Sequence, residues 1–122
     1  ETGMALKHAN PLEVIDLFHR PGLEPAPPVS VSLLRTAELQ IIRLVLPAGH
    51  RMPSHQVQGV VTLQCLQGRV DIDASGGRCT LAEGQLVTLP GDEPHSLHAD
   101  VPAIVLLTLV HPIPGKWRPR DE

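Results

Sequence analysis

Histidines gather in two short segments of the sequence. GHRMPSHQVQGVV holds His50 and His55, and PGDEPHSLHA holds His95 and His98. Imidazole binds transition metals and exchanges protons near neutral pH. The two segments therefore predict a metal site, a catalytic base, or histidines whose ring nitrogens are satisfied by hydrogen bonds.

Short strands must position these histidines. Thirteen prolines and ten glycines divide the chain into short apolar runs, and no long segment keeps a helical period. We expect about eight to ten strands joined by tight turns, which favours an all-β domain closed as a single small jelly-roll barrel. The expected strands cover residues 29–35, 39–46, 55–65, 69–73, 78–81, 85–89, 95–99 and 103–110.

Alternation along residues 55–65 indicates which side chains point inward. His55 shares one face with a set of mostly apolar residues, while glutamines and Thr62 dominate the other face. The apolar face is predicted to line the barrel interior, and its further members are Val57, Gly59, Val61, Leu63 and Cys65. On the following strand, Val70 and Ile72 are expected to face inward and Asp71 outward. Residues 95 and 98 lie three apart, so His98 should point away from the interior that His95 faces.

The spacing around His55 resembles the first motif of the cupin family, which are small jelly-roll barrels. Gly49, His55 and Gly68 match that motif in register. Val57 stands where the family has a second histidine, and Val61 stands where it has a glutamate.

The spacing around His95 resembles the second cupin motif. Gly84, Pro90 and His95 match in register, whereas Asp92 replaces a glycine and Ala99 replaces an asparagine. Together the two motifs span Gly49 to Ala99, and the flanking strand-like runs continue the same plan.

The resemblance implies a ligand site inside the barrel, with His55 and His95 as the retained polar groups. Metal-binding cupins use three histidines and a carboxylate, so this chain is expected to be metal-free or to bind a divalent transition metal (iron, manganese, zinc or nickel) weakly. His50 is the residue that could complete a metal site with His55 and His95. The valines at two ligand positions make the pocket apolar, which disfavours an uncompensated dication.

Three functions are open at this stage. The first is a small-molecule site anchored by His55 and His95 and lined by apolar side chains: Val57, Val61, Leu63 and Met52, with Cys65 and Leu97. The second is a metal-dependent cupin enzyme of the dioxygenase or isomerase type. The third is a dimeric scaffold or sensing domain, because Leu44, Leu46, Val105, Leu107 and Leu109 supply apolar surface for either an interface or a core. In each case we expect a homodimer.

Composition excludes several partners. The net charge of −3 and a pI near 6.2 leave no basic stripe for nucleic acid. No apolar run is long enough to predict a membrane span, and the chain starts without the pattern of a signal peptide, so we expect a cytoplasmic protein. Cys65 and Cys79 lack metal-site spacing and are expected to be buried free thiols.

One domain fits the length of 122 residues. We interpret residues 1–3 as an expression remnant before Met4, residues 4–28 as an arm with a proline-rich linker, 29–111 as the barrel and 112–122 as a tail. Within the arm, Leu12 to Phe18 is consistent with a short helix or an edge strand.

Overall fold

The computed structural model describes residues 8–18, 29–56, 58–89 and 92–111, and for Val29 and His55 it describes the backbone alone. These residues contain nine strands. The expression remnant, the proline-rich linker and the tail predicted from the sequence lie outside these residues. In chain order the strands are β1 (Val29–Arg35), β2 (Leu39–Leu46), β3 (His50–His55), β4 (Val60–Gln67), β5 (Arg69–Ala74), β6 (Gly77–Ala82), β7 (Leu86–Leu89), β8 (His95–Ala99) and β9 (Ala103–Val110).

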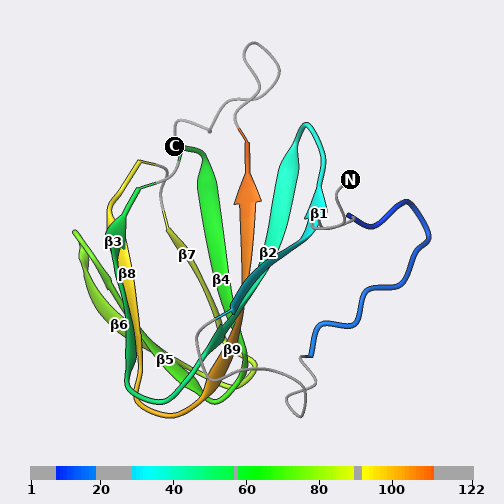
Figure 1. Ribbon diagram of the computed structural model, residues 1–122. Coiled ribbons are helices and arrows are strands. Elements are labelled where there is room, and N and C mark those ends of the chain that lie inside the picture. Colours follow the sequence, from blue (N-terminus) through cyan, green and yellow to red (C-terminus); the bar gives the residue numbers. More distant parts are fainter. Residues whose placement is uncertain (1–7, 19–28, 57, 90–91, 112–122) are drawn as a thin grey trace.

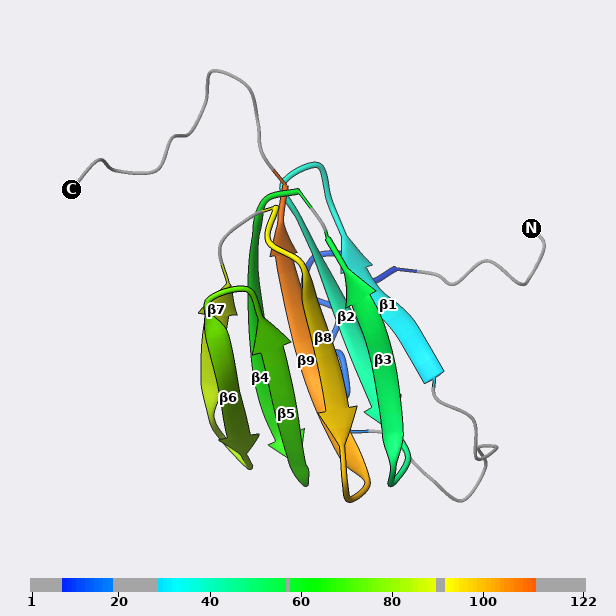
Figure 2. The same cartoon turned by 90° about the vertical axis from the view of Figure 1, so that its left-hand side faces the viewer.

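The strands form two antiparallel sheets that face each other (Figure 1 and Figure 2). One sheet has the order β1-β2-β9-β4-β7, and the other has the order β3-β8-β5-β6. The all-β jelly-roll prediction is confirmed, since the described residues contain no helix. For the same residues, the model therefore holds no helix that could span a membrane.

An aliphatic core joins the two sheets. Strict alternation along β4, β5 and β8 sends every second side chain into it, as the sequence predicted for Val70 and Ile72. The sequence left open whether five apolar residues form an interface or a core. Leu44, Leu46, Val105 and Leu107 are core residues, and Leu109 packs against that core. Their side chains are therefore not available to a partner. The core contains Leu44, Leu46, Val61, Leu63, Cys65, Val70, Ile72, Leu81, Leu89, Leu97, Ala99, Ala103, Val105 and Leu107.

Residues 55–65 do not form one strand, which corrects the sequence prediction. β3 ends at His55, and β4 starts at Val60 in the opposite sheet. Gly59 has a φ of 95°, a conformation that favours glycine and allows the chain to turn between the sheets. The alternation of apolar and polar residues along 55–65 therefore continues across a turn and does not mark a single strand.

The N-terminal arm is neither the helix nor the strand that the sequence predicted. Residues 12–18 lack both structures, and Leu12 takes a φ of 72° that is incompatible with a regular element. The arm is held to the five-stranded sheet by Ala9, whose amide donates to Leu33 O, and by Arg43, whose Nη1 donates to Asp16 O. Side-chain and backbone hydrogen bonds, not helical periodicity, fix this segment.

Three glycines of the two sequence motifs have left-handed backbones. Gly49, Gly68 and Gly84 have φ values of 81°, 83° and 85°. At Gly68 the chain also passes close to another segment, because a Cβ atom placed there would lie 2.1 Å from the carbonyl oxygen of Pro102. Only glycine fits this position.

We predict that Gly68→Ala destabilises the fold far more than Gly49→Ala. Both substitutions force a side chain into a left-handed conformation, which costs of order 1 to 3 kcal/mol. At Gly49 an added Cβ meets nothing within 4 Å, so only this cost applies, whereas at Gly68 the clash with Pro102 is added. Chemical denaturation of the two variants and the wild type would measure the difference, and equal losses of unfolding free energy would contradict the close approach.

Candidate functional site

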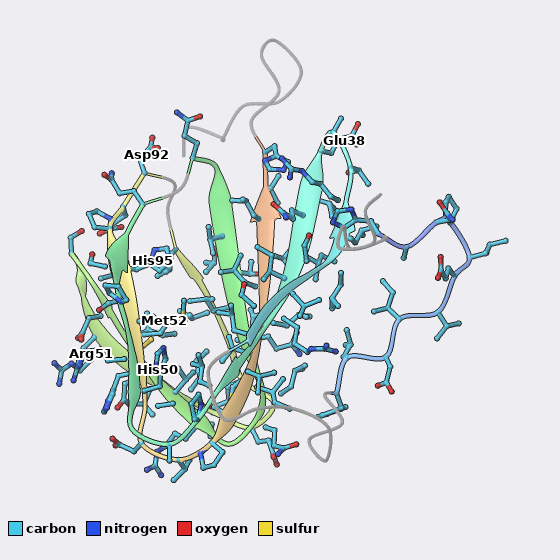
Figure 3. The ribbon with its side chains drawn as sticks, in the orientation of Figure 1. Glu38, His50, Arg51, Met52, Asp92 and His95 are labelled. Carbon is cyan, nitrogen blue, oxygen red and sulfur yellow. The ribbon has the colours of Figure 1, made fainter. Side chains whose placement is uncertain are left out.

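His55 and His95 lie opposite each other at one end of the β3–β8 pair. They are register partners across the two strands, so the backbone brings together the two histidines that the motifs singled out. The side chain of His95 is directed into the space between the sheets (Figure 3) and is only 2% exposed. Its Nδ1 lies 3.3 Å from the carbonyl oxygen of Glu93. His95 is thus a buried polar group at the end of an apolar core.

His50 lies at the other end of the same strand pair. Its register partner is Ala99, four residues from His95 along β8, which separates the two backbones by about 13 Å. Met52 lies between them, opposite Leu97 (Figure 3). The structure therefore places the backbone of His50 at the end of the strand pair opposite to His95.

Two loops meet above the histidine pair. The side-chain amide of Gln56, the residue after His55, donates a hydrogen bond to the carbonyl oxygen of Asp92. Asp92 occupies the position of a motif glycine and keeps a left-handed backbone with a φ of 66°. Aspartate tolerates this conformation better than most residues, so the turn before β8 survives the replacement.

The apolar residues predicted to line a ligand site lie in or near the core. Val61 and Leu63 are fully buried members of it, and Met52 is half-buried against it. Val57 lies outside the described residues. Val61 is the strand partner of Leu89, which places it at the same end of the barrel as His95.

A pocket of about 380 Å³ opens between β5, β6 and the end of β7, and His95 is not among the described residues that line it. Its size lies within the range of about 300 to 1,000 Å³ that is typical of small-molecule sites. Ala74, the register partner of His95 on β5, lines it, as does Leu89. The described residues that line it are Ile72, Ala74, Gly76, Gly77, Arg78, Cys79, Leu89 and Glu93.

Sequence reasoning missed this pocket. Its walls come from β5, β6 and the turn between them, the end of β7 and the loop before β8. These elements follow one another along the chain, but β7 belongs to the opposite sheet, and the sequence alone does not show that its end faces β5 and β6. The sequence could have indicated Glu93 as a pocket residue, because it lies two residues before His95 of the second motif. Cys79 could also have been indicated, because it lies two residues before Leu81 and therefore shares the inward face of β6.

Charges at the pocket rim are unevenly compensated. The Nε of Arg78 lies 2.6 Å from Asp73 Oδ1, and this hydrogen bond raises the pKa of the guanidinium. Glu93 is half-buried and has no ion pair within the described part of the chain. The pocket therefore presents one uncompensated carboxylate.

A second polar cluster lies on the opposite side of the four-stranded sheet. His98 alternates outward, as predicted, with Nδ1 3.7 Å from Asp71 and Nε2 3.3 Å from Asp100. One possible ligand atom from each of the three residues lies within 4.8 Å of the other two, so this cluster could hold a metal ion, and it is the one such group among the described residues. The cluster is partly exposed, and acidic groups in such positions are common without a bound ion.

The two cysteines are free thiols, as predicted, but only one is fully buried. Cys65 lies in the core, and burial raises its pKa. Cys79 is half-buried and lines the pocket. The two thiols should therefore differ in reactivity, because the thiolate is the reactive form and must reach the reagent.

We predict that a thiol reagent modifies one cysteine in the native protein and two after unfolding. Cys79→Ser should abolish the native reaction, and Cys65→Ser should leave it unchanged, because only Cys79 is accessible. Absorbance with a disulfide reagent at neutral pH would count the groups. Equal reaction rates of both thiols in the folded protein would contradict the burial of Cys65.

Comparisons with known proteins agree with this architecture. A conserved protein of unknown function from Streptococcus pyogenes is 24% identical, with 85% of this chain and 99% of that chain covered and a TM-score of 0.69. An RmlC-like cupin from Desulfovibrio desulfuricans is 21% identical, with 89% and 100% covered and a TM-score of 0.66. A cupin superfamily protein from Desulfitobacterium hafniense is 16% identical, with 73% and 82% covered and a TM-score of 0.68.

These structural matches establish the fold. No curated protein matches the chain. The family model of the AraC-like ligand binding domain matches residues 46–112, which is more than half of the chain and includes both histidine motifs. The chain therefore belongs to the family of AraC-like ligand-binding domains, within the cupin superfamily.

Proposed function

We propose that this domain binds one small, largely apolar molecule at the end of the barrel where His55 and His95 meet. The two imidazoles act as polar anchors for a single polar group of the ligand. Val61, Leu63 and Met52, with Val57, supply the hydrocarbon below it. In this proposal the chain functions as a ligand-binding or sensing domain and is metal-free or binds a metal only weakly.

The observation that carries the proposal is the pairing of His55 with His95 across β3 and β8. Support also comes from the pocket beside Ala74 and Leu89, which are the strand partners of His95 and Val61. The match to a ligand-binding family points in the same direction.

The alternative is a metal-dependent enzyme of the dioxygenase or isomerase type with His55, His95 and His50 as ligands. The separation of His50 from His95 weighs against it. The remaining two imidazoles fall short of the three or more protein ligands that catalytic metal sites usually have.

We predict that His55→Gln and His95→Gln each weaken ligand binding by about tenfold or more, the loss expected from one buried hydrogen bond. The probes are short aliphatic and single-ring alcohols, amides and acids, screened by NMR with labelled histidine rings. His98→Gln is the matched control, because it removes an imidazole from the outer face of the same strand. Wild-type affinity in both inner-face variants would refute the proposal.

Metal analysis of the same samples separates the two functions. The proposal expects less than one tightly bound transition-metal ion per chain in the wild type. One full equivalent that is lost in His55→Gln and His95→Gln, but kept in His98→Gln, would establish the metal site instead.

We further propose that two copies of the domain pair through the outer face of the five-stranded sheet. That face combines half-buried aliphatic side chains with Arg43, Thr62, Gln64 and Thr108, and Arg43 holds part of the N-terminal arm against it through the carbonyl oxygen of Asp16. Its half-buried aliphatic side chains neither belong to the core nor pack against it: Leu34, Leu39, Ile41, Val45, Val60 and Leu106. A second copy would cover this surface by an isologous contact.

We predict that Ile41→Glu or Leu106→Glu converts the dimer to a monomer, because each buries a charge at the centre of the proposed contact. Arg69→Glu, on an exposed position of the other sheet, is the control and should leave the dimer intact. Size-exclusion chromatography with light scattering measures the mass, and circular dichroism verifies folding. A monomeric wild type at micromolar concentration would contradict the proposal.

A further inference from the structure

The pocket between β5, β6 and the end of β7 combines a hydrocarbon floor with one acidic group. Ile72, Ala74 and Leu89 expose apolar side-chain atoms to it, and the first and last of these are core residues. Glu93 stands at the rim above the turn between β5 and β6. Its Oε2 lies 4.0 Å from the point where a Cβ of Gly76 would be. A ligand in this pocket meets hydrocarbon below and a carboxylate at one side.

The guanidinium at the pocket rim is already paired, whereas the carboxylate is not paired with any described residue. Arg78 is the cation that lines the pocket, and its guanidinium is paired with Asp73. Asp73 and the exposed Asp92, the residue before Glu93, do not line the pocket. Among the described lining residues, Glu93 is the carboxylate and Arg78 is the guanidinium, and Arg78 is paired with Asp73 while Glu93 has no ion pair.

We infer that this pocket binds the aliphatic or single-ring body of a cationic ligand, an amine whose ammonium group pairs with Glu93. A carboxylate ligand would be repelled by the same group, and a neutral ligand would desolvate Glu93 without compensation. An ammonium group compensates the charge and donates hydrogen bonds to the carboxylate. The inference rests on the proposed function and names the chemical class of its ligand.

Cys79 supplies a readout inside the pocket. It lines the cavity and is half-buried, while Cys65 lies in the core. A molecule that fills the pocket should therefore slow the modification of Cys79 without affecting the fold. The amide signals of Gly76 and Gly77, which also line the pocket, give a second readout that needs no thiol chemistry.

The experiment compares three probes of the same length on the full chain: hexylammonium, 1-hexanol and hexanoate. We expect hexylammonium to protect Cys79 and to shift both glycine amides with an affinity about tenfold higher than that of 1-hexanol, the gain expected from one charge-assisted hydrogen bond. Hexanoate should bind more weakly than either. Glu93→Gln should reduce hexylammonium to the affinity of 1-hexanol.

Glu83→Gln is the matched control. It removes the same charge from an exposed turn at the other end of β6 and should leave the preference for the amine intact. Equal affinities for hexylammonium and 1-hexanol, a preference for hexanoate, absence of binding by all three, or an unchanged preference in Glu93→Gln would each overturn the inference. Such a result leaves the role of His95 standing, because that role is tested separately by comparing the His95→Gln variant with the His98→Gln control.

Discussion

Burial of one face of each sheet is the constraint on which this structure depends. The inner faces consist almost entirely of aliphatic side chains, and burial of each contributes about 1.5 to 3 kcal/mol relative to exposure. Because side chains alternate along a strand, fixing Leu97 in the core also fixes its neighbours. His95, two residues earlier, must point inward, and His98, one residue later, must point outward. The hydrophobic register thereby selects which histidine can meet a ligand.

Left-handed turns close the strands at the positions that this register requires. Gly68 turns the chain from β4 into β5 against the carbonyl of Pro102, where no side chain fits. At the turn before β8 the requirement is only for a positive φ, and Asp92 satisfies it. A family motif can thus lose a glycine where conformation alone is constrained, but not where two backbones touch. This difference explains why the second motif still forms its turn although Asp92 replaces the glycine of the family motif.

The strands were largely predictable because alternation reports burial directly. β1, β2, β8 and β9 have the expected bounds, and the inward and outward faces of β5 were correct. The prediction failed at residues 55–65, because a period of two continues through a turn when the turn residues happen to match it. The arm was unpredictable for another reason: its position depends on hydrogen bonds to Leu33 and Arg43, which come from distant strands. For the candidate site, motif spacing singled out His55 and His95, which the structure places as register partners, whereas the pocket could be found only from the pairing of the strands.

The two sides of β8 offer different chemistry to the same type of residue. Outside, His98 lies between two partly exposed carboxylates, where water and salt screen the charges. Inside, His95 lies at the end of a hydrocarbon core, where each polar contact is stronger and each uncompensated charge is more costly. Val61 stands where metal-binding relatives carry an acidic ligand, and its side chain completes that core. Replacing a ligand by hydrocarbon lowers the affinity for a dication and raises it for an organic molecule. The same substitution that weakens the metal motif therefore strengthens the case for a small-molecule site.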